Sequence, residues 1–295
     1  MLTLTAGEAT LLLAPEIGGS IVQWRRGGRA MMRPTAPEVL AQARAENNAR
    51  LLASYPLVPF SNRVAGRRFT WQGVTHTLPE RFGGFAIHGV GWLRAWTVAA
   101  HTASTARLEL VHAPSADWPF AFRAWQEFTL TADALAIGIG MENTDSQPAP
   151  AGFGLHPFFP RSPAATLQFS AQSVWRNGRP GQIPSERIAL PPEWDYRAGM
   201  RVGAHFVDNG FAGWDGRARL AYPDLGYALT IAADPVFGHA VVYVPDGKDF
   251  FAVEPVSHMN DALNRMDSEP DHGVLVPAPG EARGGRTVFA VEALA

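Results

Sequence analysis

Residues 122–143 read FRAWQEFTLTADALAIGIGMEN, and this stretch decides the fold. In its second half large apolar residues fall at every second position, with small or polar residues between them: Leu135, Ile137, Ile139 and Met141. A period of two places these side chains on one face of a β-strand, whereas a helix would scatter them around its axis. Residues 122–130 alternate in the same way, so the connector at 131–134 predicts a β-hairpin.

Further strand patterns extend to both sides of this hairpin. Residues 107–111 and 227–232 alternate similarly, and residues 240–244 form a continuous apolar run typical of a strand buried on both faces. Residues 37–46 consist of good helix formers and predict either a helix or an irregular excursion. Residues 176–192 hold three clusters of glycine and proline and predict a long surface loop.

No repeat and no stretch of linker composition divides the 295 residues. Chains of this length can form two domains, but large β-sandwiches often reach it as one unit. We therefore expect one domain over residues 1–295. Its fold class is all-β and mostly antiparallel, with few or no helices.

Composition excludes several classes of protein. With 46% hydrophobic and 18% charged residues the chain is not intrinsically disordered. A net charge of −2 without a basic run argues against a nucleic-acid partner. The absence of cysteine excludes disulfides, thiol catalysis and zinc–thiolate sites. No apolar window approaches 18 residues and no signal-peptide pattern is present, so we expect no membrane partner and a cytoplasmic location.

Two segments place polar residues among apolar ones in the first third of the chain. Asn62 and Arg63 lie within residues 59–66, where an arginine could donate several fixed hydrogen bonds to ligand oxygens or, alternatively, to loop carbonyls. His88 lies within residues 82–92 among glycines that would let backbone or ligand approach closely. The alternative for His88 is a satisfied core or turn residue.

A third segment, residues 152–160, contains His156 before Pro157, followed by Phe158. A residue before proline is biased toward an extended conformation. Aromatic faces suit the apolar face of a sugar ring, and a histidine can give or take a proton near neutral pH. The alternative is a strand end with core phenylalanines and an incidental histidine.

A fourth segment, residues 243–255, ends in Glu254, which shares one face of a predicted strand with Phe250 and Ala252. Desolvation on an apolar face would raise the pKa of this carboxyl toward that of a useful general base, although most strand-end glutamates are simply solvated. Asp208 is a weaker candidate, because Asp-Asn-Gly is also a good turn sequence.

Other chemistries find little support in the sequence. The chain lacks GxSxG, GxxxxGK[ST] and a strand-linked GxGxxG, and no histidine pair has HxxxH spacing. We therefore expect no metal and no cofactor, although distant strands could still assemble a metal site.

Taken in order, these segments resemble the aldose 1-epimerase (galactose mutarotase) family, and an uncharacterised bacterial branch of it in particular. The resemblance runs from about Leu11 to Glu292. It is carried by the following marks: Asn62-Arg63-Val64 with Gly66 and Phe69, His88-Gly89 leading to Trp92, His156-Pro157-Phe158-Phe159, Asp208, Glu254-Pro255, and Asp261-Ala262-Leu263-Asn264.

The resemblance implies a galactose mutarotase-like β-supersandwich that interconverts the α and β anomers of a free aldose without metal or cofactor. Glu254 would take the proton from the C1 hydroxyl, and His156 would protonate the ring oxygen. His88 would help to polarise or position the ring oxygen. The resemblance also implies the substrate-binding residues Arg63, Asp208, Asn62, Phe158 and Trp214. An acid and a base acting together predict a bell-shaped pH profile.

The resemblance leaves the sugar open, because Phe158-Phe159-Pro160-Arg161 stands where better-known mutarotases often have Tyr-Phe-Asn after the His-Pro. A hexose 6-phosphate is an alternative to a free aldose, provided that the fold gathers basic residues such as Arg67, Arg68, Arg81 and Arg161. A non-catalytic sugar-binding or sensor protein is a second alternative. A glycoside hydrolase, using Glu254 and Asp208 as its carboxylate pair, is a third. The sequence does not decide between monomer and homodimer.

Overall fold

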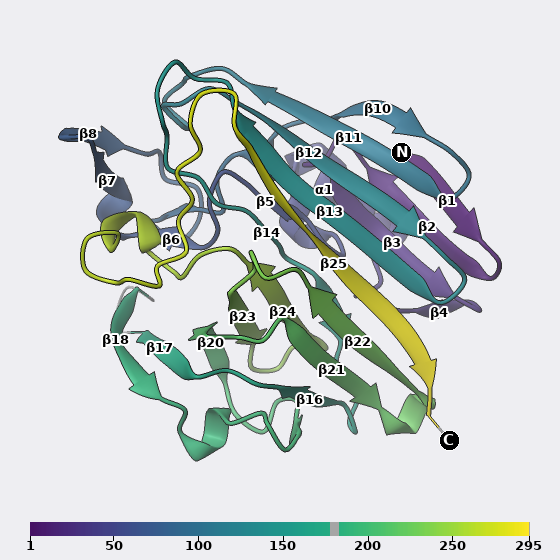
Figure 1. Cartoon of the computed structure of the whole chain (residues 1–295). Coiled ribbons are helices and arrows are strands. Elements are labelled where there is room, and N and C mark those ends of the chain that lie inside the picture. Colours follow the sequence, from purple (N-terminus) through teal and green to yellow (C-terminus); the bar gives the residue numbers. More distant parts are fainter. Residues whose placement is uncertain (178–182, 295) are drawn as a thin grey trace.

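The structure is a computed structural model that describes residues 1–177 and 183–294 (Figure 1). It consists of β-sheets and short connections with one α-helix among the described residues. Each named pair of neighbouring strands in this part of the chain is antiparallel. The all-β, mostly antiparallel prediction is therefore confirmed.

The largest sheet has nine strands and contains the predicted hairpin, formed by β12 and β13. Figure 1 shows its long C-terminal strand β25 between β13 and β22. The strands in spatial order are β10 (Thr97–His101), β11 (Thr105–His112), β12 (Phe122–Leu130), β13 (Ala134–Asn143), β25 (Ala282–Ala293), β22 (Tyr227–Ala233), β21 (Arg217–Tyr222), β16 (Thr166–Phe169) and β19 (Met200–Arg201).

A second sheet has eight strands, several of them very short. Its strands in spatial order are β18 (Pro184–Ala189), β17 (Ser173–Asn177), β20 (Val207–Ala212), β23 (His239–Val244), β24 (Phe250–Val256), β14 (Gly154–Leu155) and β5 (Pro56–Leu57), with β15 (Phe158–Pro160) also paired to β24. The run predicted at 240–244 lies in β23 and is buried on both faces, as expected.

Smaller elements complete the fold. A four-stranded sheet comprises β1 (Leu2–Ala6), β2 (Ala9–Ala14), β3 (Ser20–Arg26) and β4 (Arg29–Ala30). Two ribbons pair β6 (Arg63–Val64) with β9 (Ala86–Ile87) and β7 (Arg68–Trp71) with β8 (Val74–Thr77). The helices are α1 (Pro37–Glu46) and the single 3₁₀ turns η1 (Ala49–Leu51), η2 (Ala65–Arg67), η3 (Gly91–Leu93), η4 (Pro192–Trp194), η5 (Pro223–Leu225) and η6 (Ala262–Asn264).

The main apolar core joins the inner faces of the nine-stranded and eight-stranded sheets. Strand alternation supplies it from both sides, with Phe128 and Ile137 from the nine-stranded sheet and Phe251 and Val253 from β24. A second, smaller cluster takes the other face of β24, where Ala252 and Val256 pack with residues from the segment around η1. Because β24 is buried on both faces, a polar side chain on it is withdrawn from bulk water.

The two local predictions made for residues outside the strands have different outcomes. Residues 37–46 form α1, which begins with Pro37, ends at Glu46 and is followed by Asn47 in the left-handed conformation, so the prediction of a helix is confirmed. The long loop at 176–192 is wrong for the described residues, because β17 and β18 pair as neighbouring strands. The cluster at 178–182 lies outside the described residues. Pro184 is tolerated because it is the first residue of an edge strand.

Candidate functional site

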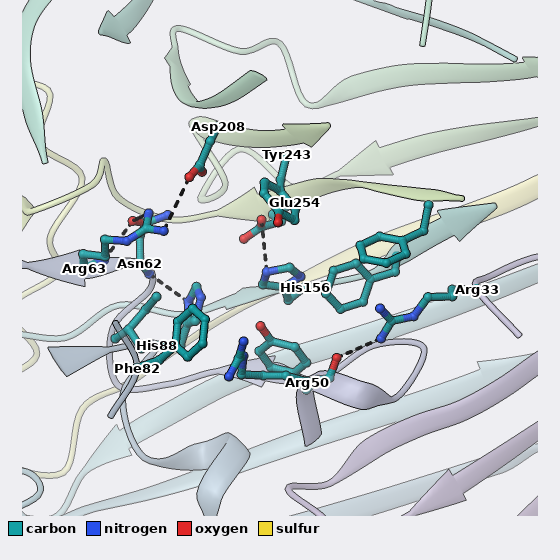
Figure 2. A pocket seen from close by; sticks show the side chains of 14 residues that line it. Arg33, Arg50, Asn62, Arg63, Phe82, His88, His156, Asp208, Tyr243 and Glu254 are labelled. Atoms are coloured by element: carbon teal, nitrogen blue, oxygen red, sulfur yellow. Dashed lines mark hydrogen bonds and ion pairs between the residues drawn. The ribbon is translucent and has the colours of Figure 1, made fainter. Parts of the chain in front are cut away.

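A cavity of about 250 Å³ opens on the face of the eight-stranded sheet that carries the second cluster (Figure 2). This volume lies just below the range of about 300–1,000 Å³ typical of pockets for drug-sized ligands, so it suits a smaller molecule. Seven of the eight predicted site residues line it. The lining residues are Arg33, Arg50, Tyr55, Asn62, Arg63, Phe82, Ile87, His88, His156, Phe158, Asp208, Tyr243, Phe250 and Glu254.

An interruption in the sheet brings His156 to Glu254. Strands β14 and β15 both pair with β24, one on each side of residues 156 and 157. Counting two residues inward from either pairing places His156 opposite Glu254 (from Gly154 with Val256, or Phe158 with Ala252). Opposite residues of an antiparallel ladder project to the same face with Cβ atoms about 4.5–5.5 Å apart. Nε2 of His156 accordingly lies 3.3 Å from Oε1 of Glu254.

Proline keeps this short gap open. Pro157 has no N–H to donate to β24, and the backbone N–H of His156 instead donates to the Tyr55 carbonyl oxygen at 3.0 Å. The ring of Tyr55 stacks on the imidazole of His156 with centroids 4.6 Å apart. The backbone and the ring of His156 are therefore both held by the same neighbouring residue.

Burial shifts the pKa values of Glu254 and His156 in opposite directions. Burial raises the pKa of Glu254 well above its usual value, with the Asp208 carboxylate adding to the effect and Arg63 opposing it. Burial, aided by the Arg33 guanidinium, lowers the pKa of His156 to about 3. Near neutral pH the pair therefore shares one exchangeable proton, either as carboxylic acid and imidazole or as carboxylate and imidazolium. Such a pair can accept a proton from a ligand at Glu254 while His156 donates a proton to another atom of the same ligand.

His88 and Asn62 lock each other in place. Both have a positive φ, 61° for His88 and 55° for Asn62. The backbone N–H of Asn62 donates to Nδ1 of His88 at 3.0 Å, and the N–H of His88 donates to the Asn62 carbonyl at 3.0 Å. Since Nδ1 accepts a hydrogen bond, the neutral ring carries its proton on Nε2. Burial lowers the pKa of His88 well below its usual value, so the ring is neutral at pH 7.

Only glycine fits at position 89, directly after His88. Its φ is +66°, and an added Cβ would lie 2.2 Å from the Val58 carbonyl oxygen. The close approach predicted near His88 is thus an approach of backbone.

Arg63 and Asp208 form an ion pair on the wall of the cavity. Nη2 of Arg63 lies 3.4 Å from Oδ2 of Asp208, and their side chains are only 11% and 9% exposed. The backbone N–H of Arg63 donates to Oδ1 of Asn62 at 2.8 Å. Burial raises the pKa of Asp208, while the Arg63 guanidinium opposes this shift. The turn alternative for Asp208 is wrong, because Asp208 lies in β20, which pairs on both sides with β17 and β23.

The segment after β24 supports the loop that carries Asn62 and Arg63. Oδ1 of Asp261 accepts hydrogen bonds from the Ala65 N–H and from Nδ2 of Asn264, both at 2.8 Å. The backbone N–H of Asp261 donates to the Arg63 carbonyl at 3.1 Å. These contacts give Asp261 and Asn264, quoted above as part of the resemblance, a physical role: they fix the backbone on which Arg63 stands.

Sequence reasoning missed several lining residues. Phe250 was placed on the face of Glu254 but not assigned to the site, and Tyr243, which lies opposite Ala252 on the neighbouring strand, was not placed at all; both line the cavity. Arg33 stacks on Phe158 at 3.9 Å from the ring centroid and donates to the carbonyl oxygens of Arg50 (2.8 Å) and Leu52. No sequence signal marks Arg33 or Arg50, because only the tertiary fold brings residues 33 and 50 to this wall.

Trp214, predicted to bind the substrate, does not lie at the cavity. It is buried in the main core, and its indole N–H donates to the Arg217 carbonyl at 2.9 Å. It does not belong to the residues that line the cavity in the described chain, so we leave it out of the proposed site.

The four arginines considered for a phosphate are not gathered at the cavity either. Arg81 pairs with Asp117, and Arg161 donates to loop carbonyls, for example that of Pro245 at 3.3 Å. Arg67 is the last residue of η2 and Arg68 is the first residue of β7, and neither is part of the cavity lining.

Within residues 1–177 and 183–294, no three or more histidine, aspartate or glutamate side chains are grouped as metal ligands would be. The same part of the chain holds no helix with the length and apolarity needed to cross a bilayer.

Comparison with known proteins identifies the family. The family model of aldose 1-epimerase matches residues 1–290. The uncharacterised protein YphB of Escherichia coli (strain K12) is 32% identical over 300 residues, covering 98% of each chain. YihR of the same strain, also uncharacterised, is 28% identical over 219 residues and covers 70% of each.

Solved structures of the same fold are similar over almost the whole chain. A proposed aldose 1-epimerase from Escherichia coli K12 has a TM-score of 0.88 and 31% identity, with 99% of this chain and 98% of that chain covered. A galactose mutarotase-like protein from Clostridium acetobutylicum has a TM-score of 0.87 at 18% identity, covering 99% and 95%. The expected galactose mutarotase-like fold is confirmed.

Proposed function

Because this chain belongs to the aldose 1-epimerase family, we propose that it interconverts the α and β anomers of an aldose by general acid–base catalysis in the cavity. One observation carries this proposal: the carboxyl of Glu254 and the imidazole of His156 lie 3.3 Å apart, buried and facing the same cavity of monosaccharide size. The expected roles of the remaining residues follow from the atoms that they present to this space.

Ring opening moves one proton off the sugar and one proton onto it. Glu254, as carboxylate, takes the proton from the C1 hydroxyl, and the oxygen left behind forms the aldehyde double bond to C1. The bond between C1 and the ring oxygen breaks, and its electron pair stays on the ring oxygen, which takes a proton from Nε2 of His156. Each positioned group contributes a rate factor of about 10²–10⁴.

These two transfers convert the carboxylate–imidazolium form of the pair into the carboxylic acid–imidazole form. Rotation about C1–C2 then presents the other face of the aldehyde. Reclosure reverses both transfers, so the pair returns to its starting form without exchanging a net proton with solvent. The opposite pKa shifts of Glu254 and His156 both favour the carboxylic acid–imidazole form, which is the form that the pair adopts when the ring has opened.

Three further residues are proposed to hold the sugar. His88 presents Nε2–H as a donor to the ring oxygen or a neighbouring hydroxyl, since its Nδ1 is occupied by Asn62. Arg63 and Asp208 offer a donor and an acceptor to the ring hydroxyls. Phe158 and Tyr55 supply aromatic surface beside the imidazole of His156.

Exchange NMR on freshly dissolved α-glucose and α-galactose tests the proposal. We expect the protein to accelerate anomeric exchange above the spontaneous rate, Glu254→Gln to abolish the acceleration, and the exposed Glu8→Gln to retain it. Loss of rate in Glu254→Gln with sugar binding retained would support the assignment of the base. Sugar binding without any acceleration by the wild type would refute the catalytic function and leave a binding protein.

A further inference from the structure

The side chain of Arg50 stands apart from the other two arginines of the cavity. Its guanidinium stacks on the ring of Phe82 at 3.5 Å from the centroid. Within the described chain neither a carboxylate within ion-pair distance nor a hydrogen-bond acceptor is found for it. Arg63 is paired with Asp208, and Arg33 donates to backbone carbonyls between two aromatic rings.

The charges around the cavity do not balance. Three arginines line it against two carboxyl groups, Asp208 and Glu254. Asp208 offsets Arg63. Burial lowers the pKa of Arg33 to about 10, with Tyr55 and Asp249 opposing the shift, and Arg33 donates to the carbonyl oxygens of Arg50 and Leu52. Glu254 shares its proton with His156, so this pair is neutral overall. Among the described residues, Arg50 is the one cavity arginine whose side chain has neither an ion-pair partner nor a hydrogen-bond acceptor.

The position of Arg50 separates it from the reacting pair. Figure 2 shows its guanidinium next to Phe82, on the side of the cavity away from Asp208 and Tyr243. Phe82 is 46% exposed, although it is a large apolar residue, and its ring supports one face of the guanidinium. Stacking of this kind fixes the plane of an arginine and leaves its N–H edge free to meet a planar or tetrahedral group of oxygens.

We propose that Arg50 binds an anionic group on the sugar, so that the substrate is an aldose that carries a carboxylate or a phosphate. This inference rests on the proposed mutarotase function and names its substrate class. An anion satisfies the donors of Arg50 and neutralises its charge. A neutral hydroxyl meets only part of the hydrogen bonding and leaves the charge unpaired as the cavity fills and water leaves. The site therefore favours a charged aldose over its neutral counterpart.

The test compares matched sugars by exchange NMR, each corrected for its own spontaneous rate. Glucose and galactose are the neutral members; glucuronate, galacturonate and glucose 6-phosphate are the charged ones. We expect kcat/KM of at least one charged sugar to exceed that of its neutral counterpart tenfold or more. The uronates and the phosphate distinguish a carboxylate site from a phosphate site.

Substitution assigns the preference to Arg50. In Arg50→Gln the ratio of kcat/KM, charged over neutral, falls at least tenfold, whereas Arg50→Lys keeps part of it. Arg68→Gln, an exposed arginine outside the cavity, keeps the full ratio. Equal rates for charged and neutral sugars in the wild type, or a ratio unchanged in Arg50→Gln, would overturn the inference.

Binding measured in Glu254→Gln separates this inference from the proposed function. Calorimetry with glucuronate and glucose should show tighter binding of glucuronate, and Glu254→Gln/Arg50→Gln should lose that difference. Absence of anomeric exchange with every sugar would refute the mutarotase function, even where this binding difference remained. A missing binding difference alongside measurable exchange would refute only the role of Arg50.

Discussion

The two large sheets are built by different rules. In the nine-stranded sheet β11, β12 and β13 pair in continuous register over almost their whole length, and apolar side chains alternate along most of it, with the buried Gln126 as an exception in β12. In the eight-stranded sheet, β14 and β15 together contribute only five residues beside β24 and leave a gap between them. The gap is where His156 meets Glu254. An unbroken ladder supplies stability, and an interrupted one frees a polar side chain to face a cavity.

We expect the largest effect on the rate from a substitution at the gap between β14 and β15. His156→Gln removes the proposed acid and should lower kcat about 10³–10⁴-fold, or roughly 4–5.5 kcal/mol. Exchange NMR measures the rate, and the matched control His101→Gln, on the exposed edge strand β10, should leave it unchanged. A loss of less than tenfold in a folded variant would remove His156 from the proton transfers.

A core substitution in the nine-stranded sheet should instead lower stability and leave the rate almost unchanged. Phe128 is fully buried in the main core, so Phe128→Ala should cost about 3–5 kcal/mol in the free energy of unfolding. Urea denaturation measures this loss. At a temperature where the variant is still folded, kcat should remain within about threefold of the wild type. A large fall in kcat of the folded protein would mean that the two sheets are not separable in function.

Asp261 holds the backbone segment that carries Arg63, so its substitution should have an intermediate effect on kcat/KM. Asp261→Ala removes the acceptor of the Ala65 N–H and should lower kcat/KM about 10–100-fold, mainly through KM, because Arg63 is proposed to bind the sugar.

The backbone of Asp261 has a φ of +56°, which asparagine tolerates better than alanine. Asp261→Asn should therefore recover most of the loss, and the exposed Asp267→Ala should have none. An equal loss in the alanine and asparagine variants would contradict the proposed hydrogen-bonding role.

The pH dependence of the rate probes the shared proton. Adding a second proton, which charges His156 while Glu254 stays protonated, blocks the base, and removing the shared proton blocks the acid. Burial lowers the pKa of His156 to about 3 and raises that of Glu254, so the acid limb should lie low and the alkaline limb well above the usual glutamate value. We expect a broad bell for kcat/KM, with about a tenfold loss per pH unit outside its plateau. A profile that loses rate on only one side of its plateau would refute the acid–base assignment.

The two sheets also differ in how well the sequence predicts them. The hairpin of β12 and β13 follows directly from its period of two, because each position on one face packs into the main core. Glu254 was identified for the same reason: alternation placed it with Phe250 on one face of β24, and both line the cavity. Periodicity is a local property, so it predicts the face on which Glu254 lies, whereas the role of Glu254 as a base was implied by the resemblance to the family.

The features that the sequence did not predict depend on contacts between distant segments. Arg33 and Arg50 reach the cavity only because the segment around η1 packs beside β15 and β24. Asp-Asn-Gly at 208–210 favours a turn locally, but all three residues pair with β23, and Gly210 also pairs with β17, so the segment is part of β20. Trp214 is close to Asp208 in the sequence, yet its indole packs in the main core. Tertiary pairing outweighs local propensity at each of these places.

Ion pairs provide the finest comparison between the two regions. Arg107 and Glu127 face each other across β11 and β12 on the nine-stranded sheet, with side chains 37% and 53% exposed. A double-mutant cycle with Arg107→Gln and Glu127→Gln should give a coupling energy of only about 0.2–1 kcal/mol in thermal or urea unfolding. Added salt at about 1 M, where the screening length is roughly 3 Å, should reduce it further. The same cycle on Arg63 and Asp208, which are almost fully buried, should keep its coupling in salt and should also change kcat/KM. If both pairs responded alike to salt, burial of the Arg63–Asp208 pair would not be what distinguishes the cavity from the scaffold.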